Sequence, residues 1–141
     1  MRTLAIITVA ALALVACGGS SEQSASDAAE QMYSYMGKGQ FGRDYDMLHP
    51  AHQAVVARER FIECAQGSAG FSVSKVGAEE EFDEDYDVAR VGLIPTRAVT
   101  LKYNIGELEQ HRTIHMVDVD GSWRWIMGED DLSAYESGNC P

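Results

Sequence analysis

The sequence contains few cysteines, few prolines and few basic residues. Three cysteines and three prolines occur among 141 residues, and 22 acidic side chains outnumber 11 basic ones, so the formal net charge is −11 at pH 7. A surface of this sign repels phosphate groups, which argues against nucleic acid as a partner and against a basic patch on anionic lipid. The sequence also lacks a phosphate-binding loop, a nucleophile elbow and a zinc-ligand set, so we expect no cofactor and no metal.

A long hydrophobic run is missing as well. The longest apolar stretch extends from Leu4 to Ala16, and Thr8 is its only polar residue. As a helix of about 13 residues it would span roughly 20 Å, whereas the hydrocarbon core of a bilayer is roughly 30 Å thick. Because the stretch follows Arg2 and ends among small residues, it is typical of a secretory signal and too short for a comfortable permanent span.

The apolar stretch ends at a cysteine. The segment Leu14-Val15-Ala16-Cys17 resembles the bacterial lipobox. The resemblance implies that lipid is attached to the Cys17 sulfur, that the chain is cleaved before Cys17, and that the new amine is acylated. Several acyl chains on one residue hold a protein stably at a membrane. The alternative is an ordinary signal peptide with a cysteine at this position by chance.

These features divide the chain into three parts. We expect residues 1–16 to be a lipoprotein signal peptide, residues 17–27 a lipid-anchored flexible tether, and residues 28–141 a single domain. The protein is then exported and anchored to the cell-envelope membrane, on the periplasmic or outer face, through lipid on Cys17. We therefore expect the membrane to be a partner of the protein, through the lipid on Cys17.

Two further cysteines remain when Cys17 is assigned to the anchor. Cys64 and Cys140 form an even pair in an exported protein, and an oxidising compartment favours a disulfide between them. Two thiols without nearby histidines make a poor zinc site.

The first half of the domain has the periodicity of helices. Ser24 and Asp27 form a helix-start signal, and Gly37 and Gly39 follow the end of the first predicted helix. The predicted helical faces comprise Ala25, Ala28, Ala29, Met32 and Met36, then Phe41, Tyr45 and Leu48, then Ala51, Ala54 and Val55 after Pro50, and last Phe61, Cys64 and Ala65.

The second half alternates with a period of two, as strands do. Residues 99–105 and 113–119 alternate cleanly, Asp120-Gly121 is a tight-hairpin signal, and residues 88–94 are predicted to be a strand that ends at Pro95. The chain is therefore predicted to be an α+β domain, with N-terminal helices packed on a curved antiparallel sheet of four to six strands.

The run EEEFDEDYD places seven carboxylates in residues 79–87. Asp83, Asp85 and Asp87 have the spacing that opens a calcium loop, but Val88 stands where the loop needs glycine and Ile94 where it needs glutamate. We therefore predict a solvated acidic hairpin turn, with weak association of divalent ions left open.

The order of elements, with GQFGRDYDMLHP after the first helix and VDGSWRW near the end, is similar to the nuclear transport factor 2-like superfamily. The similarity covers about residues 23–130. It implies a cone-like sheet folded round a long first helix, with a pocket at its wide end. Members include isomerases, dehydratases and binding domains, so the fold alone does not define the function.

Four residues are candidates for such a pocket: Tyr33, Tyr103, His115 and Trp125. His115 shares an alternating set with Thr113 and Val117, which allows it to face inward, although a lone strand histidine is more often structural. In one interpretation the Trp125 ring forms part of the wall that contacts a ligand, and in the other it packs in the core of the sheet. The enzyme interpretation would use Tyr33, Asp46, Tyr103 or His115 for proton transfer, but none of them matches a catalytic motif, and we assign no catalytic residue.

The function favoured by these observations is non-catalytic binding of a small apolar ligand or of an envelope protein. One alternative is an isomerase or lyase with an acid–base pair in the pocket. Another is a scaffold or assembly role through an exposed sheet face, which would allow a homodimer.

Overall fold

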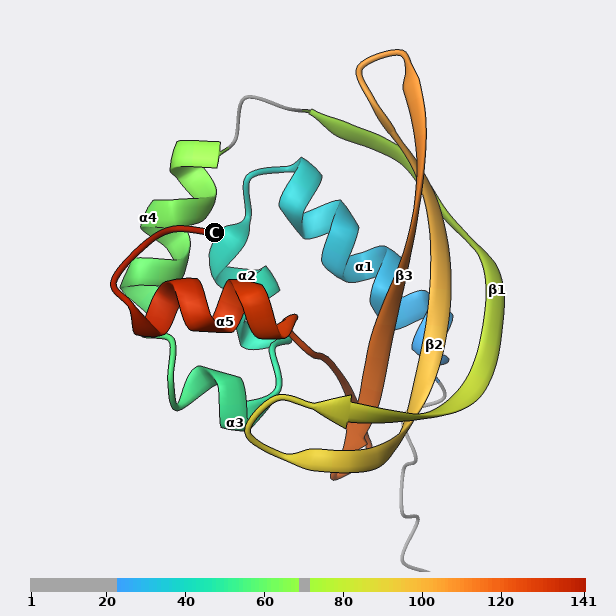
Figure 1. The fold of residues 1–141 in the computed structure, drawn as a ribbon. Helices are drawn as coiled ribbons and strands as arrows, with labels where there is room; N and C mark the ends of the chain where they lie inside the picture. The colour runs from blue at the N-terminus through green and yellow to red at the C-terminus, as the bar shows by residue number, and fades with distance from the viewer. Residues whose placement is uncertain (1–22, 69–71) are drawn as a thin grey trace, which may run out of the picture.

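A computed structural model describes residues 23–68 and 72–141, and the fold is α+β (Figure 1). The predicted signal peptide and Cys17 lie outside the described residues. The elements are α1 (Ala25–Gly37), α2 (Phe41–Asp46), α3 (Pro50–Gln53), α4 (Arg58–Ser68), β1 (Val73–Val88), β2 (Gly92–Ile105), β3 (Leu108–Val119), β4 (Ser122–Trp125) and α5 (Glu129–Glu136). No helix in the described part of the chain is long and apolar enough to cross a bilayer.

The first helix starts at a capping box. The Ser24 hydroxyl accepts a hydrogen bond from the Asp27 N–H at 3.0 Å, and the Asp27 carboxylate accepts one from the Ser24 N–H at 3.3 Å. These two bonds satisfy amides that a helix start leaves without partners. The helix begins at Ala25, as the Ser24 and Asp27 signal predicted, so residues 25–27 of the expected tether are helical.

The four strands form one antiparallel meander in the order β1-β2-β3-β4. Figure 1 shows the sheet curving round α1, with α3, α4 and α5 grouped on the far side of that helix. The turn between β3 and β4 consists of Asp120 and Gly121, whose φ angles of 54° and 79° are both positive. Such a two-residue turn matches the twist of its strands, and it lies at the Asp120-Gly121 position that the sequence predicted for a tight hairpin.

The acidic run is a strand and not a hairpin turn. Residues 79–87 lie inside β1. Residues 80–87 pair with β2 in register, a register shift lies at Glu79, and the turn follows at residues 89–91. Arg97 of β2 stabilises the run, because its side chain lies 3.1 Å from the Asp83 carboxylate and 3.8 Å from that of Glu81. Most of β1 is exposed at the edge of the sheet, so its sequence carries no hydrophobic alternation.

Pro95 lies within β2 and does not end a strand. It is opposite Asp85 of β1, while the pairing of β2 with β3 extends only from Arg97 to Ile105. At Pro95 the strand therefore has a partner on one side only. Proline is tolerated at such a position because no ladder hydrogen bond needs its missing N–H.

The core has two parts that meet at Trp125. The first part contains Ala25, Ala28, Ala29, Met32 and Tyr33 of α1 with Val99, Leu101, Ile114 and Met116 of the sheet. The second part contains Phe41, Tyr45, Leu48, Val56, Phe61, Met127 and Leu132 of the other helices and their connections. Trp125 packs against both parts, so β4 joins the sheet to the helical layer.

His52 connects three segments inside the second part of the core. Its side chain is completely buried, and its Nε2 lies 2.9 Å from the Ala89 carbonyl oxygen. Its Nδ1 accepts a hydrogen bond from the Met127 N–H at 3.0 Å, so Nε2 carries the proton and donates to Ala89. One imidazole thus holds α3, the β1–β2 turn and the segment before α5 together.

We expect His52→Leu to destabilise the domain by about 2–4 kcal/mol, because it leaves the buried Met127 N–H and the partly buried Ala89 carbonyl oxygen without this partner. Chemical denaturation at pH 7 measures this loss. His111→Leu is the matched control, since His111 is exposed. An equal, small effect of both substitutions would show that the His52 hydrogen bonds do not hold these segments.

Candidate functional site

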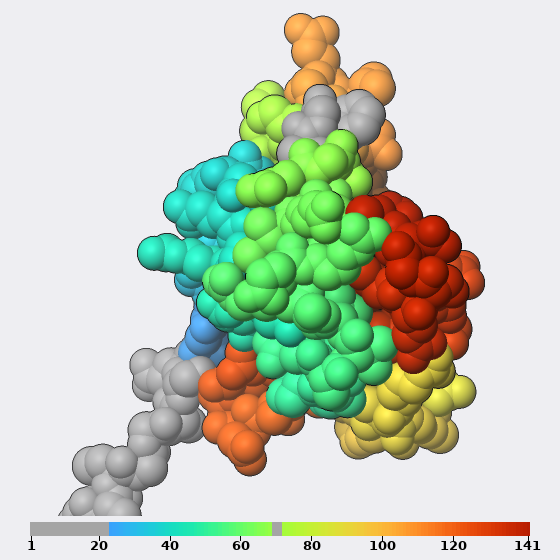
Figure 2. Space-filling view, turned by 90° about the vertical axis from the view of Figure 1, so that its left-hand side faces the viewer, coloured from blue at the N-terminus to red at the C-terminus, as the bar shows by residue number. Residues whose placement is uncertain are grey.

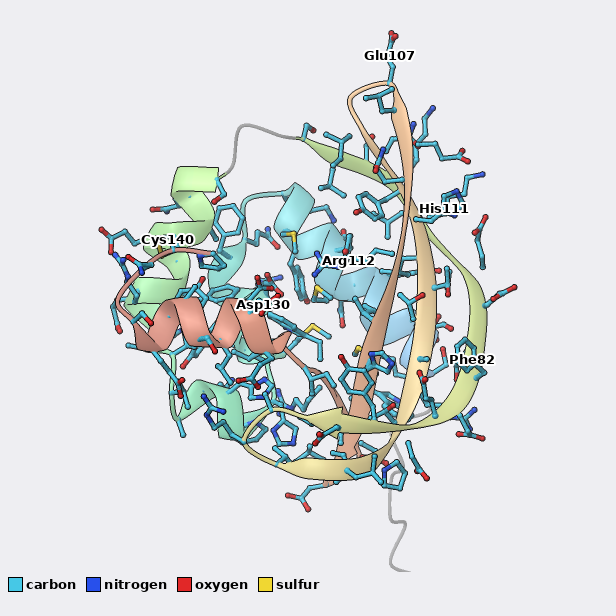
Figure 3. All side chains as sticks on the ribbon, in the orientation of Figure 1. Phe82, Glu107, His111, Arg112, Asp130 and Cys140 are labelled. Atoms are coloured by element: carbon cyan, nitrogen blue, oxygen red, sulfur yellow. A yellow bond between two sulfur atoms is a disulfide. The ribbon has the colours of Figure 1, made fainter. Side chains whose placement is uncertain are left out.

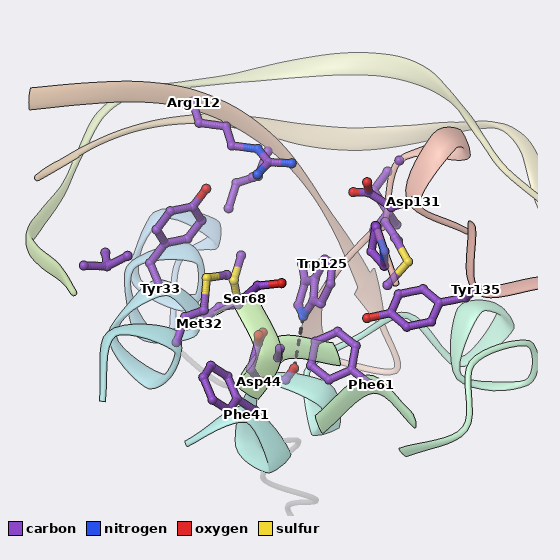
Figure 4. A pocket seen from close by; sticks show the side chains of 18 residues that line it. Met32, Tyr33, Phe41, Asp44, Phe61, Ser68, Arg112, Trp125, Asp131 and Tyr135 are labelled. Carbon is purple, nitrogen blue, oxygen red and sulfur yellow. Dashed lines mark hydrogen bonds between the residues drawn. The ribbon is translucent and has the colours of Figure 1, made fainter. Parts of the chain in front are cut away.

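A cavity of about 310 Å³ lies between α1, α2, α4, α5 and the strands β3 and β4 (Figure 4). Most of its wall is apolar. Met32, Phe41, Phe61, Ile114, Trp125 and Met127 are among the lining residues. The ionisable lining side chains are Asp44, Arg112, Asp131, Tyr33 and Tyr135.

Asp44 lies on the buried face of α2. With Phe41 and Tyr45 it occupies the i, i+3 and i+4 positions of one stripe of α2, and it is only 1% exposed. Its Oδ1 has no hydrogen-bond partner among the described residues. An unpartnered carboxyl group in an apolar wall is costly when charged, so it favours the neutral form.

The electrostatics of Asp44 follow from this position. Burial raises the pKa of Asp44 from 3.8 to about 7, and the neighbouring indole of Trp125 opposes the rise. The indole N–H donates its hydrogen bond to the Asp44 main-chain carbonyl oxygen at 3.0 Å. Near neutral pH the carboxyl group can therefore accept or release a proton.

Arg112 and Tyr33 form the wall opposite Asp44 (Figure 4). Arg112 precedes Ile114 by two residues on β3 and so shares its side of the sheet. In Figure 3 it points toward α1, while His111 points away. Arg112 is exposed and forms no ion pair with a described carboxylate. Burial raises the pKa of Tyr33 to about 12, against the opposing charge of Arg112.

The last segment of the chain completes the wall. Asp131 and Tyr135 of α5 line the cavity together with Pro141. Burial raises the pKa of Tyr135, and the carboxylates of Asp131 and Asp44 contribute to the rise, while Arg60 opposes it. The charges of α5 and α2 are therefore close enough to influence one another.

A disulfide holds this segment in place. The Cys64 and Cys140 sulfurs are 2.02 Å apart, and Arg60 donates a hydrogen bond to the Gly138 carbonyl oxygen at 2.8 Å. Figure 2 shows the C-terminal segment (red) against α4 (green), and Figure 3 shows Cys140 beside that helix. Because Pro141 follows directly, the disulfide also positions part of the cavity wall.

The structure brings two of the four candidate pocket residues into the cavity wall. Tyr33 and Trp125 line it, whereas Tyr103 packs against Tyr33, with ring centroids 4.9 Å apart, and does not line it. Asp46, a candidate of the enzyme interpretation, is exposed and its carboxylate lies 3.2 Å from Arg58.

His115 lies away from the cavity. Its neighbours Ile114 and Met116 are in the core beside α1, so the histidine side chain points to the other side of the sheet. There its ring stacks on Tyr86 at 3.7 Å, and its Nε2 lies 2.8 Å from the Glu84 carboxylate. The inward orientation that the alternation allowed does not occur, because Thr113 and Val117 belong to the set opposite Ile114.

Four ionisable lining residues were not predicted from the sequence. Asp44 could have been found, because it falls on the same helical stripe as Phe41 and Tyr45. Arg112 could have been found from its alternation with Ile114 and Met116. Asp131 and Tyr135 were missed because no helix was predicted after β4, although the three acids in the first turn of α5 are a signal that could have indicated one.

No group of three His, Cys, Asp or Glu side chains in residues 23–68 and 72–141 is placed to hold a metal ion. Neither protein-family models, nor curated proteins, nor solved structures give a match to this chain.

Proposed function

We propose that the protein is an exported lipoprotein, anchored through Cys17, whose domain binds a small and largely apolar ligand. The cavity is the observation that supports this function. Its volume of about 310 Å³ is at the lower end of the range of small-molecule sites, and its wall is apolar with a few polar side chains. Such a composition suits a ligand that is mostly hydrocarbon with one or two polar groups.

The proposal includes a cone-like domain of the nuclear transport factor 2-like type. Four of the five described helices precede the strands, α1 packs along the curved sheet, and the cavity lies beside that helix. These features support the resemblance, while the family membership itself stays a proposal.

The anchor predicts a clear result for Cys17→Ser. This variant should incorporate no labelled fatty acid and should remain unprocessed or become soluble, because only the cysteine sulfur accepts the lipid. Metabolic labelling and fractionation after a high-salt wash measure both properties. A variant that still carries labelled lipid in the membrane fraction would refute the anchor.

The cavity predicts where a neutral probe binds. Cyclohexylmethanol should shift the NMR signals of the Trp125 indole N–H and of the Ile114 and Met127 methyl groups, because these groups line the cavity. Ala65→Phe should abolish the shifts by filling the space. Gln66→Phe, on the exposed side of the same helix, is the control. Shifts scattered over the surface, or shifts unaffected by Ala65→Phe, would contradict binding in the cavity.

One observation favours a second function, that of an isomerase or lyase. Asp44 has a pKa of about 7 and lines an apolar cavity, which is the environment of many proton-transferring carboxylates. The test is the exchange of α-protons of cyclohexanone in D₂O, followed by NMR. Exchange above the buffer background that is lost in Asp44→Asn would support catalysis, and background exchange by the unmodified protein would argue against it.

A further inference from the structure

The wall of the cavity combines a buried carboxyl group with several aromatic rings. Asp44 lines it together with Phe41, Phe61, Trp125 and Tyr135. The rings form a continuous wall, since the Phe61 centroid lies 6.1 Å from that of Trp125 and 6.3 Å from that of Tyr135. The indole N–H of Trp125 is 3.0 Å from the Asp44 carbonyl oxygen, so this wall begins beside the carboxyl group.

This arrangement requires a specific kind of partner. The Asp44 Oδ1 is buried and has no hydrogen bond in the described structure, and ionised oxygens accept hydrogen bonds but cannot donate them. A ligand that binds the ionised form of Asp44 must therefore bring a donor. An ammonium group brings donors and a compensating charge together, and the faces of aromatic rings attract cations.

Resting on the proposed function, we infer that the ligand is a small primary amine bound as its ammonium ion. Its nitrogen pairs with the Asp44 carboxylate, and its hydrocarbon part lies against Phe41, Phe61 and Trp125. The surface of the protein supports this inference, because a net charge of −11 attracts cations and repels anions.

Other charged and titratable groups face Asp44 from the surrounding elements. Tyr33 projects from α1, Arg112 from β3, and Asp131 and Tyr135 from α5. α4 and β4 add no titratable side chain to the wall. The positive charge of Arg112 repels a cation, but Arg112 is exposed, so water screens this repulsion. Asp44 is buried, so its attraction for a cation is screened less. Asp131 favours a cation.

The ammonium form of the ligand predicts the sign of a pH effect. With a pKa of about 7, Asp44 is mostly protonated at pH 5.5 and mostly ionised at pH 8. Because an ammonium ion binds the ionised form, the affinity for an amine should rise over this interval by about tenfold or more. The affinity for a neutral alcohol should not rise, and that for a carboxylate should fall.

Three probes of similar shape test the inference on the unmodified domain: cyclohexylmethylamine, cyclohexylmethanol and cyclohexanecarboxylate. Each is titrated at pH 5.5 and pH 8, with the Trp125 indole signal as the readout. We expect the amine to bind at least about tenfold more tightly than the alcohol at pH 8. Asp44→Asn should remove both this preference and the pH dependence, while Asp46→Asn, an exposed control on the same helix, should keep both.

The outcomes separate the inference from the proposed function. If the alcohol or the carboxylate binds as tightly as the amine at the Trp125 signal, the cavity is a ligand site but its ligand is not an amine. If the preference for the amine survives Asp44→Asn, the cavity is a ligand site, but Asp44 does not bind the ammonium group and the inference fails. If no probe shifts the signals of the lining residues, both the inference and the proposed function fail.

Discussion

Asp44→Asn should stabilise the domain by roughly 4 kcal/mol at pH 8 and change its stability little at pH 4, because each unit of pKa shift corresponds to about 1.4 kcal/mol. Burial raises the pKa of this acid from 3.8 to about 7, so the folded state holds the proton more tightly than the unfolded state does. Asp44 therefore favours folding most below pH 3.8, and this contribution is lost as the pH rises through about 7. Asparagine resembles the neutral acid and avoids the cost of the buried charge.

Urea denaturation of the unmodified protein and of Asp44→Asn between pH 4 and pH 8 measures the difference between their free energies of unfolding. The other titrating groups are the same in both proteins, so this difference isolates the contribution of Asp44. Asp46→Asn is the matched control, since its carboxylate is exposed and paired with Arg58. Water that enters the cavity would reduce the expected gain, so the value at pH 8 is an upper estimate. A gain that does not depend on pH, or a loss of stability at pH 8, would contradict a buried unpartnered carboxyl group.

Loss of the Cys64–Cys140 disulfide should have an effect of similar size. The bond joins residues 76 positions apart, and closure of such a loop is worth up to about 4–5 kcal/mol in the chain-entropy description. That is a large part of the 5–15 kcal/mol that typically stabilises a small domain. Cys140→Ser should therefore lower the denaturation midpoint strongly, although residue 140 is exposed and leaves no cavity.

Reduction of the unmodified protein provides the control for this prediction. The reduced protein should have the same midpoint as Cys140→Ser, and reductant should not alter the variant further. Thiol titration of the oxidised, denatured domain should find no free thiol at Cys64 or Cys140. Two reactive thiols in the absence of reductant would show that the bond does not form.

The sequence was a good guide where local signals and the fold agree. Ser24 and Asp27 marked the start of α1, Pro50 marked α3, and Asp120-Gly121 marked the last hairpin. Capping, φ restriction and positive φ are local effects, so they act in the same way in the unfolded chain and in the folded domain.

The sequence was a poor guide to the structure where tertiary contacts override the local preference of the residues. The carboxylates of residues 79–87 indicate a turn when they are considered alone, but β2 and Arg97 provide strand partners that no local pattern reveals. The helix α5 was missed because its charged first turn obscured the spacing of Leu132 and Tyr135. The three acids at its start are typical of a helix N-terminus and could have indicated it.

The site shows the same division. Phe41, Asp44 and Tyr45 form one stripe of α2, so the burial of Asp44 was accessible from spacing alone. The cavity was not, because it depends on how α2, α5 and the disulfide-held tail meet, and each contact is distant in sequence. The orientation of His115 likewise depends on which of two alternating sets on β3 faces α1.

The central claim is that a buried, unpartnered carboxyl group lies in an apolar ligand cavity. The most direct test is to follow the ¹³C signal of the Asp44 carboxyl carbon in the free domain as a function of pH. We predict a titration midpoint at about 7, because burial raises the pKa of this group. A midpoint near 3.8, the ordinary value for aspartate, would show that water or another partner already satisfies the carboxylate, and would contradict the claim.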